Sequence, residues 1–292
     1  NPVKIRHFEA LMEIFYTSKE LKERLSEIKV RNKMVGFVPT MGSLHSGHGT
    51  LISRARTGSD VVVLSIYVNP TQFDNQHDFK TYPNAIQADL DLARSLGVDV
   101  VFAPKTEDIY EGVPNADSVD YGDLTGAFEG AKRKGHFDGV VAIVRRLFQI
   151  IKPEKAFFGE KDLQQLAVIE ALCKREFAQL EIVRCPLIRD IDGLALSSRN
   201  VRLNPKERIV ALELHRTLNR LKAAVNGSVE GSVALEAARR ALDSLDDLEL
   251  EYLAIIDAKS FEEVGEEKWN EGHAVIAAQV GSVRLIDNLF MG

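Results

Sequence analysis

The chain has 292 residues, 45% of them hydrophobic and 27% charged, a balance typical of a folded globular protein rather than of a disordered chain. Its 37 basic and 43 acidic side chains give a net charge of −6 without any long basic run, which argues against nucleic acid as a partner. The longest apolar stretch, residues 61–68, is far too short to span a membrane, and the opening N-P-V-K-I-R-H is no apolar signal segment, so we expect a cytoplasmic protein.

Residues 1–186 alternate short apolar runs with helical patterns, and we interpret them as one domain. The strand candidates are residues 34–38, 61–68, 98–103, 156–158 and 180–185, with helical patterns at 50–56, 85–96, 140–151 and 163–174. Strands separated by helices of this length predict right-handed βαβ crossovers in a Rossmann-like, doubly wound parallel sheet. Residues 105–139 have weak periodicity and several glycines, which indicates a loop or lid with short helices.

Residues 187–292 have a different pattern, with helical segments followed by strand-like ones, which predicts a smaller α+β domain that closes over the active site. Asn204, Pro205 and Glu207 are typical of N-cap, N1 and N3 of a helix that runs to about residue 225. The apolar side of this helix is predicted to comprise Ile209, Leu212, Leu218 and Leu221. A second helix at 234–245 and strands at 250–257, 274–280 and 282–287 complete the domain, with a tight hairpin at Gly281.

The motif P-T-M-G-S-L-H-S-G-H, residues 39–48, follows the first predicted strand and precedes a helix. Ligands of doubly wound sheets bind beyond the carboxyl ends of strands, and helix N-termini suit phosphate. His45 and His48, three residues apart, can then donate hydrogen bonds to a phosphoryl group. A surface histidine pair or two zinc ligands remain the alternatives, although no third ligand with a recognisable spacing is evident.

Two further motifs follow predicted strands in the same way. In S-I-Y-V-N-P-T-Q-F, residues 65–73, the amides of Asn69 and Gln72 suit a small substrate with hydroxyl and carboxylate groups, although a simple Asn-Pro turn is the alternative. In F-F-G-E-K-D-L-Q-Q, residues 157–165, the Lys161 ammonium suits phosphate oxygens and the Asp162 carboxylate can accept a hydrogen bond from a ribose hydroxyl. Gln165 can reach the same cleft as Gln72. A charge pattern at a helix start is the alternative there.

Two clusters of donors lie outside the predicted strand ends. D-G-L-A-L-S-S-R-N, residues 192–200, offers two hydroxyls and a guanidinium to a polyphosphate, or is an exposed loop with a serine cap. Residues 128–140 hold the one dense basic patch, Lys132, Arg133, Lys134 and His136, which is either a solvated charge run or an anion-gathering surface. The two cysteines, Cys173 and Cys185, fit buried small hydrophobes in a reducing compartment.

Taken together and in this order, the motifs resemble those of the pantoate–β-alanine ligase family, which belongs to the nucleotidylyltransferase superfamily with HIGH-type histidines. The matching patterns are P-T-M-G-x-L-H-x-G-H, N-P-x-Q-F, E-G-x-x-R-x-x-H-F-x-G-V, F-F-G-E-K-D-x-Q-Q, D-G-L-A-x-S-S-R-N and R-L-I-D-N at residues 284–288. The resemblance covers residues 36–288, nearly the whole chain.

The resemblance implies an enzyme that condenses (R)-pantoate with β-alanine through a pantoyl adenylate, using ATP with Mg²⁺ and releasing AMP and pyrophosphate. It implies an ATP site formed by Met41, Gly42, Ser43, Leu44, His45, Ser46, Gly47, His48, Gly159, Glu160, Lys161, Asp162, Ile188, Leu196, Ser197, Ser198 and Arg199. It makes His48, His45, Lys161 and Arg199 catalytic, with His48 as proton donor, and assigns Gln72, Gln165 and Asn69 to pantoate and β-alanine. It also implies a homodimer, and Mg²⁺ held mainly by the ATP phosphates.

Two positions depart from the family pattern. Thr71 replaces a methionine common among relatives, which could loosen the apolar wall beside pantoate, and Lys134 replaces a proline, which could make residues 132–136 more mobile. Neither change removes a group that the chemistry needs. The alternatives to the ligase are another small-molecule nucleotidylyltransferase and an ATP-binding module without catalysis.

Overall fold

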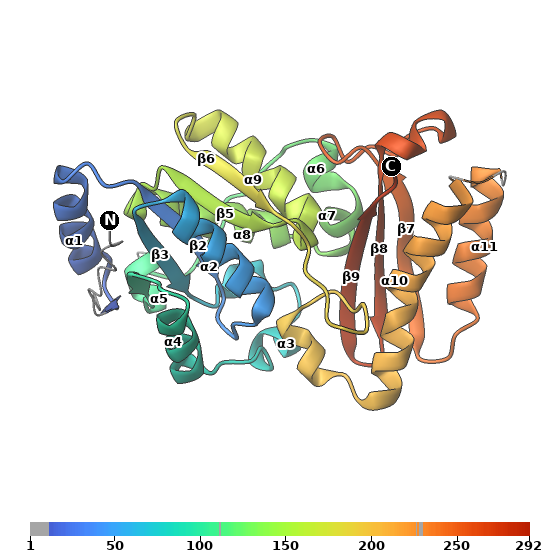
Figure 1. The fold of residues 1–292 in the computed structure, drawn as a ribbon, viewed down its shortest axis with the longest axis horizontal. Coiled ribbons are helices and arrows are strands. Elements are labelled where there is room, and N and C mark those ends of the chain that lie inside the picture. Colours follow the sequence, from blue (N-terminus) through green and yellow to red (C-terminus); the bar gives the residue numbers. More distant parts are fainter. Residues whose placement is uncertain (1–11, 111, 226, 228–229) are drawn as a thin grey trace, which may run out of the picture.

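The computed structural model describes residues 12–110, 112–225, 227 and 230–292. The opening segment N-P-V-K-I-R-H, on which the expectation about a signal segment rests, lies outside the described residues. The described part forms an N-terminal domain around a six-stranded sheet and a smaller domain around a three-stranded sheet (Figure 1). The expected Rossmann-like domain followed by a smaller α+β domain is therefore confirmed. No helix among the described residues is both long enough and apolar enough to cross a membrane.

The larger sheet is parallel throughout, in the order β1-β4-β3-β2-β5-β6. Its strands are β1 (Glu13–Phe15), β2 (Val35–Thr40), β3 (Val61–Ile66), β4 (Val100–Phe102), β5 (Lys155–Gly159) and β6 (Glu181–Cys185). The order runs outward in opposite directions from β2 and β5, so the topological switch point lies between them. Ligands bind beyond the carboxyl ends of strands at such a point, here at Thr40 and Gly159.

Helices cover both faces of this sheet because its strands are apolar on both faces. Neighbouring residues of β2 illustrate this: Phe37 packs with the cluster beneath α1, α8 and α9, and Val38 packs with the cluster beneath α2 and α4. The helical segments are α1 (Ser18–Val30), α2 (Ser46–Gly58), η1 (Pro70–Gln72), α3 (Gln76–Lys80), α4 (Ile86–Ser95), α5 (Thr106–Ile109), α6 (Asp123–Gly126), α7 (Phe128–Lys132), α8 (His136–Ile151), η2 (Glu160–Asp162) and α9 (Leu163–Glu176).

The C-terminal domain is an antiparallel meander of β7 (Leu248–Ile256), β8 (His273–Val280) and β9 (Val283–Phe290). The remaining helical segments are η3 (Ser198–Arg202), α10 (Pro205–Val225), α11 (Gly231–Asp243) and η4 (Glu266–Glu271). Helices α10 and α11 cover one face of the meander, as Figure 1 shows. The other face contributes Ala254, Ile256 and Val275 to an apolar seam with Leu163 and Ala167 of α9, which joins the two domains.

Local signals in the C-terminal domain are largely confirmed. The Asn204 side chain accepts hydrogen bonds from the backbone of Lys206 and Glu207, and Glu207 accepts one from the Asn204 N–H, which is the reciprocal cap expected for α10. The hairpin turn at Gly281 is present, with a φ of +54° that suits glycine. The placement of Ile209 was wrong: its side chain is 63% exposed, because it lies on the solvent side of α10.

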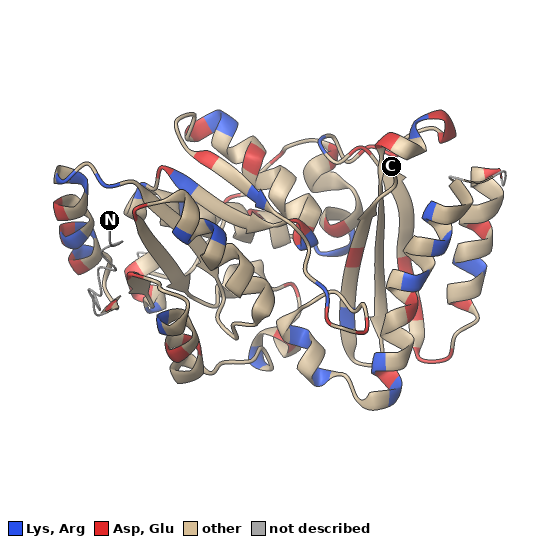
Figure 2. Ribbon diagram, viewed as in Figure 1, with Lys and Arg blue, Asp and Glu red and all other residues tan. Residues whose placement is uncertain are grey.

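Other differences concern short or edge elements of the N-terminal domain. Strand β1, at the sheet edge beside β4, and helix α1 were not predicted. The predicted helix at 140–151 begins one turn earlier, at His136, and residues 105–139 contain the short helices α5, α6 and α7. Acidic and basic residues are interspersed over both domains, as Figure 2 shows, in keeping with the modest net charge.

Candidate active site

The motif at residues 39–48 forms a tight turn between β2 and α2. Gly42 and Ser43 both have positive φ angles, +80° and +50°, and a side chain at Gly42 would collide with the carboxylate of Asp89. That buried carboxylate accepts hydrogen bonds from the backbone N–H groups of Ser43, at 2.8 Å, and Leu44, at 2.6 Å. Asp89, on α4, therefore fixes the turn that delivers His45 to the start of α2.

The two histidines of the motif are bonded to the start of the helix. The Nδ1 atom of His45 accepts from the N–H of Gly47 at 3.1 Å, and the Nδ1 atom of His48 accepts from the N–H of His45 at 3.2 Å. An imidazole that accepts through Nδ1 carries its proton on Nε2 when it is neutral. The hydrogen bonds thus assign both rings as Nε2–H tautomers, able to donate one hydrogen bond each without a net charge.

Both imidazoles are uncharged at neutral pH. Burial, followed by the positive charge of Lys161, lowers the pKa of His45 from 6.5 to about 4. Burial, followed by the neighbouring His45, lowers the pKa of His48 to about 3. The His48 ring therefore offers a neutral N–H donor in the free protein, and its role as proton donor stays a prediction.

The strand-end motif at residues 157–165 places the Lys161 side chain beside the histidines. Strand β5 ends at Gly159, and the turn η2 follows at once, with the Lys161 ammonium 3.5 Å from the carboxylate of Asp162. The carbonyls of Glu160 and Lys161 accept hydrogen bonds from the side-chain amide of Asn288, which comes from β9 of the other domain. The turn that carries the ammonium is therefore held from both domains.

The segment around Gln72 rests on α8 through close backbone contact. A side chain at Gly139 would lie 2.2 Å from the carbonyl oxygen of Thr71, so only glycine permits this approach. The Gln72 carbonyl accepts a hydrogen bond at 2.7 Å from Nδ1 of His136, whose Nε2 lies 3.0 Å from a guanidinium nitrogen of Arg133. Burial, followed by the charge of Arg133, lowers the pKa of His136 to about 4, so this ring is also neutral.

Asn69 and Thr71 are committed to structural hydrogen bonds outside the cavity. The fully buried Asn69 donates to the carbonyl of Gly139 and accepts from the hydroxyl of Tyr110 and from that of Thr71. Asn69 is therefore not among the residues that line the cavity, and its place near β-alanine stays a prediction. The Thr71 side chain likewise faces Asn69 and Tyr110 and is not among the residues that line the cavity.

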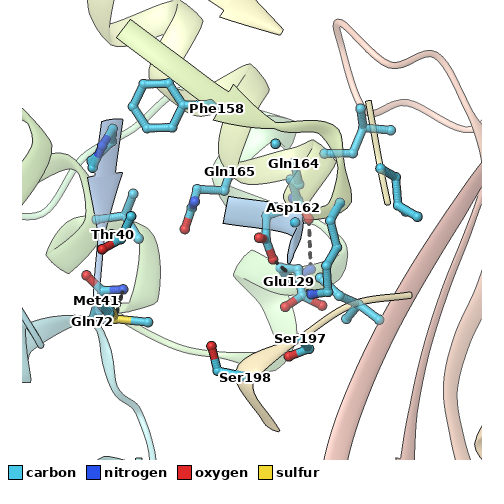
Figure 3. Close-up of a pocket in the computed structure, with 18 of the residues that line it drawn as sticks. Thr40, Met41, Gln72, Glu129, Phe158, Asp162, Gln164, Gln165, Ser197 and Ser198 are labelled. Atoms are coloured by element: carbon cyan, nitrogen blue, oxygen red, sulfur yellow. Dashed lines mark hydrogen bonds and ion pairs between the residues drawn. The ribbon is translucent and has the colours of Figure 1, made fainter. Parts of the chain in front are cut away.

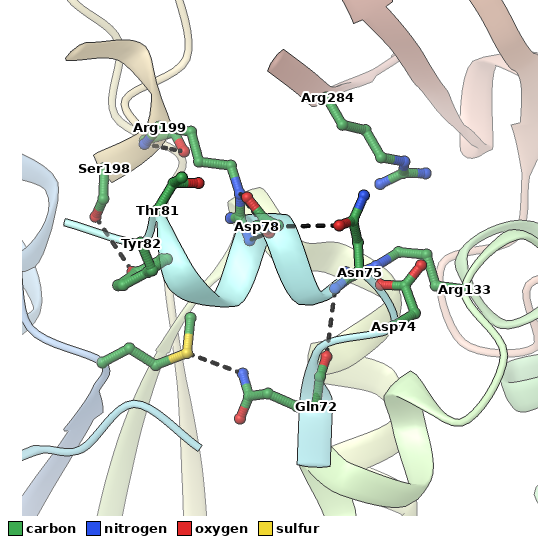
Figure 4. Close-up of polar contacts among 12 residues, drawn as sticks. Gln72, Asp74, Asn75, Asp78, Thr81, Tyr82, Arg133, Ser198, Arg199 and Arg284 are labelled. Atoms are coloured by element: carbon green, nitrogen blue, oxygen red, sulfur yellow. Dashed lines mark hydrogen bonds and ion pairs between the residues drawn. The ribbon is translucent and has the colours of Figure 1, made fainter. Parts of the chain in front are cut away.

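The serine-rich loop of the C-terminal domain closes one side of the site. The Ser198 hydroxyl donates to the carbonyl of Ser43 at 3.1 Å, which joins this loop to the histidine turn. The Arg199 guanidinium points to the carboxylate of Asp78 on α3, with a shortest distance of 2.7 Å, and Arg202 binds the same carboxylate at 2.8 Å (Figure 4). Asp78 thereby links α3 to the loop from the other domain.

These segments surround one cavity of about 260 Å³ between the domains. Figure 3 shows Gln165 and Gln72 directed toward a common space, with Ser197 and Ser198 on the far side from Phe158. The expected residues that line it are Met41, His45, Gly47, His48, Gln72, Gly159, Lys161, Asp162, Gln165, Ile188, Leu196, Ser197, Ser198 and Arg199. Those absent from the lining are Gly42, Ser43, Leu44, Ser46, Glu160 and Asn69.

Several lining residues carried no assigned role in the sequence analysis. Arg133 and His136 turn inward from the basic patch, whereas Lys132 and Lys134 are exposed, so the patch does not act as a unit. Glu129 also lines the cavity, and although burial opposes ionisation, its ion pair with Arg284 at 2.6 Å lowers its pKa to about 2. Tyr82 belongs to no motif, and no local pattern identifies it.

A metal site made by protein side chains alone is not evident. Within residues 12–110, 112–225, 227 and 230–292, no three His, Cys, Asp or Glu side chains converge as metal ligands do. Among the residues that the structure describes, the pair His45 and His48 has no third ligand of the kind that the zinc alternative requires. Both cysteines are buried, and burial raises the pKa of the Cys173 thiol to about 12 and that of Cys185 to about 11.

Comparison with known proteins gives a consistent result. The family model described as pantoate-beta-alanine ligase matches residues 13–290. A pantothenate synthetase of Bacteroides fragilis is 42% identical over 283 residues, which are 95% of this chain and 98% of the relative. One of Cytophaga hutchinsonii is 43% identical over 273 residues, 93% of this chain and 96% of the relative.

Solved structures agree with the sequence relatives. The crystal structure of pantothenate synthetase from Thermus thermophilus superposes with a TM-score of 0.89 at 39% identity, covering 96% of this chain and 99% of that one. Pantoate-beta-alanine ligase from Francisella tularensis, complexed with beta-gamma ATP and beta-alanine, superposes with a TM-score of 0.81 at 34% identity, covering 96% and 98%.

Proposed function

The chain belongs to the pantoate–β-alanine ligase family and is an ATP-dependent enzyme that forms pantothenate, and on this premise we propose how its cavity carries out the reaction. The observation that supports the proposal is the convergence of His45, His48, Lys161, Gln72 and Gln165 on one cavity at the switch point of the sheet. Two amides suit a small hydroxy acid, and three nitrogen donors suit a phosphate chain.

We assign the two substrates of the first step to opposite sides of the cavity. ATP lies with its adenine under Ile188, its ribose at Asp162, and its phosphates against His45, His48, Lys161, Ser197, Ser198 and Arg199. Pantoate lies against Gln72 and Gln165, with its carboxylate toward the α-phosphate. β-Alanine then enters beside Gln72, near Asn69, whose buried amide donates to the carbonyl of Gly139.

The chemistry in this proposal needs alignment and charge more than a protein nucleophile. The pantoate carboxylate attacks the α-phosphorus and pyrophosphate leaves; the β-alanine amine then attacks the acyl carbon of the pantoyl adenylate and AMP leaves. Neutral Nε2–H donors of His45 and His48, with the Lys161 ammonium, stabilise charge that grows on the phosphate oxygens in the first step. Neither thiol is suited to act as a nucleophile, given the raised pKa values.

Mg²⁺ fits this donor set as an ion carried by ATP. Magnesium is usually held by one or two carboxylates, several waters and substrate phosphates, and because Asp162 is assigned to the ribose, the ATP phosphates and water would hold the ion. When bound, the ion would neutralise part of the triphosphate charge. The residues of this chain would then hold and orient the remaining phosphate oxygens.

A mixed anhydride hydrolyses in water, so the cavity must be shielded during the reaction. We propose that residues 196–199, as part of a C-terminal domain spanning 187–292, close over the phosphates. Ser198 already joins this loop to the histidine turn, and Arg199 is held beside the cavity by Asp78. Residues 132–139, the second candidate lid, include the first turn of α8, where His136 is bonded to the Gln72 carbonyl, so we assign the closure to residues 196–199.

We also propose a cytoplasmic homodimer. Support comes from the family relationship and from two buried cysteines that form no disulfide with each other. Light scattering of the purified protein tests the dimer, with twice the chain mass as the expected result.

The direct test of the proposed site removes the ammonium or one imidazole. Lys161→Ala and His48→Ala should each lower pantoate-dependent release of pyrophosphate by roughly 10²–10³, the usual loss for one well-placed donor, because the transition-state charge loses a partner. Circular dichroism checks the fold, and Lys174→Ala, an exposed lysine of α9, is the matched control.

Wild-type rates in Lys161→Ala and His48→Ala would refute the site. The product analysis separates the alternative functions: pyrophosphate release without free AMP, even when β-alanine is present, indicates another nucleotidylyltransferase, whose product keeps the AMP group. ATP bound without any turnover, measured in a single-turnover experiment with labelled ATP, indicates a binding module.

A further inference from the structure

The sequence R-L-I-D-N at residues 284–288 lies in β9, far along the chain from the strand-end motifs, and the proposed chemistry uses none of its side chains. Asp287 and Asn288 nevertheless line the cavity, and the polar residues of this motif bind other parts of its wall. Arg284 binds Glu129, Asp287 binds Arg189, and Asn288 reaches the turn of Lys161. The last contact bears on the proposed catalytic ammonium most directly.

The Asn288 amide satisfies two carbonyls of the lysine turn. Its Nδ2 atom donates to the carbonyl of Glu160 at 2.8 Å and to that of Lys161 at 3.1 Å. The turn η2, which ends at Asp162, has no side-chain cap of its own at its N-terminus. Because one nitrogen binds consecutive carbonyls, it fixes the orientation of both peptide planes and so of the Cα from which the Lys161 side chain departs.

The position of Asn288 is itself fixed from three sides. Its side chain is buried, its N–H donates to Asp287 at 2.7 Å, and its carbonyl accepts from Arg189 at 3.2 Å. Arg189 and Asp287 form a two-point ion pair at 2.6 and 2.8 Å. The hairpin β8–β9 pairs Asn288 with Val275. A rigid strand of the second domain thus presents one amide to the turn of the first.

We propose that Asn288 is a positioning residue for the reaction, which acts by holding Lys161 in place against the phosphates of ATP. The inference rests on the role of Lys161 in the proposed function. It assigns to the C-terminal domain a direct part in aligning the ammonium, in addition to covering the cavity. Misplacement of a reacting group by about 1 Å can cost about 100-fold in rate, so a small displacement of this turn has a large expected effect.

The test replaces the amide by a carboxylate of the same shape. In Asn288→Asp the two donated hydrogen bonds are lost and an oxygen faces the two carbonyls. We expect kcat for pantoate-dependent pyrophosphate release to fall about 100-fold, with the KM for pantoate unchanged, since Gln72 and Gln165 are untouched. The matched control is Asn219→Asp on the exposed side of α10. It removes the hydrogen bond that the Asn219 side-chain amide donates to the carbonyl of His215, and it should keep full activity.

A double-mutant cycle separates positioning from general damage. If Asn288 acts through Lys161, adding Asn288→Asp to Lys161→Ala should change the residual single-turnover rate by no more than about twofold, because the group to be positioned is gone. A further 100-fold loss in that background, or a wild-type rate for Asn288→Asp alone, overturns the inference. A wild-type rate for Lys161→Ala instead overturns the proposed site. Should Asn288→Asp fail to fold by circular dichroism, Asn288→Ala carries the same cycle without the added charge.

Discussion

At the scale of single residues, the site depends on side chains that hold backbone rather than substrate. Asp89 is the clearest case, since its buried carboxylate accepts the N–H groups of Ser43 and Leu44 in a turn that has a positive φ at a non-glycine residue. A buried N–H without an acceptor is costly, so the turn requires this partner. The geometry of His45 is therefore decided 44 residues away in the sequence, on α4.

Asp89→Asn should destabilise the protein by about 1–3 kcal/mol, because the amide keeps one acceptor and turns its NH₂ group toward a backbone N–H. Urea unfolding at neutral pH measures the change. The control is Asp91→Asn on the same helix, an exposed carboxylate that contacts Gln87 and Arg94 and should shift stability by less than about 0.5 kcal/mol. Equal effects of the two substitutions would contradict this role of Asp89.

At the scale of elements, the cavity wall depends on how closely α8 approaches the segment after β3. Gly139 of α8 touches the backbone of Thr71 and Gln72, and its carbonyl accepts the amide of Asn69. The contact puts Gln72 against the helix that also carries His136. One glycine therefore sets the distance between two elements that are separated by some 70 residues of sequence.

Gly139→Ala should force α8 and the Gln72 segment apart, because the added carbon would lie 2.2 Å from a carbonyl oxygen. We expect a loss of about 1–3 kcal/mol in the free energy of unfolding, as for other overpacked sites. Pantoate, titrated calorimetrically, should bind more weakly than to the unaltered protein.

The matched control is Gly58→Ala, whose new carbon would meet only the ring of Phe157, at 3.4 Å or more. It should leave pantoate binding unchanged. Unaltered pantoate affinity in Gly139→Ala would show that the close approach does not set the position of Gln72.

At the scale of the whole molecule, burial of neutral imidazoles makes stability depend on pH. The pKa values of His45, His48 and His136 fall from 6.5 to about 4, about 3 and about 4. Below pH 6.5 these imidazoles bind protons in the unfolded chain but stay neutral in the folded chain. Their contribution to the free energy of unfolding is therefore fully present above pH 6.5 and is lost as the pH falls toward 4. Glu129, with its pKa lowered to about 2, adds stability that is lost only below about pH 4.5.

The free energy of unfolding should therefore decrease between pH 6.5 and 5, by up to about 1.4 kcal/mol per pH unit for each such histidine. Urea unfolding at pH 7.5, 6.5 and 5.5 measures the slope. His136→Asn, whose amide can still donate to the Gln72 carbonyl, should reduce that slope relative to the unaltered protein. A slope of zero, or one that His136→Asn leaves unchanged, would show that these imidazoles are not held neutral.

The sequence by itself determined the type of sheet and the segments that carry the chemistry. A run such as Val61–Ile66 is apolar on both faces because helices cover both faces of a parallel sheet, and this signal is local. Motifs that directly follow such runs, with Lys161 and His45 among them, must lie at one edge of the sheet. Short or edge elements such as β1 gave no comparable signal, because three residues are too few for a period.

Only the tertiary structure decided which side chains hold these motifs in place. The contacts of Asp89 with Ser43, of Asp78 with Arg199 and of Asn288 with Lys161 join residues 46, 121 and 127 positions apart. Hydrogen bonds of this kind leave no periodic trace, because each depends on the packing of two elements that the chain brings together only when folded. For the same reason, the burial of Asn69 and its hydrogen bond to the Gly139 carbonyl could not be recognised from its motif.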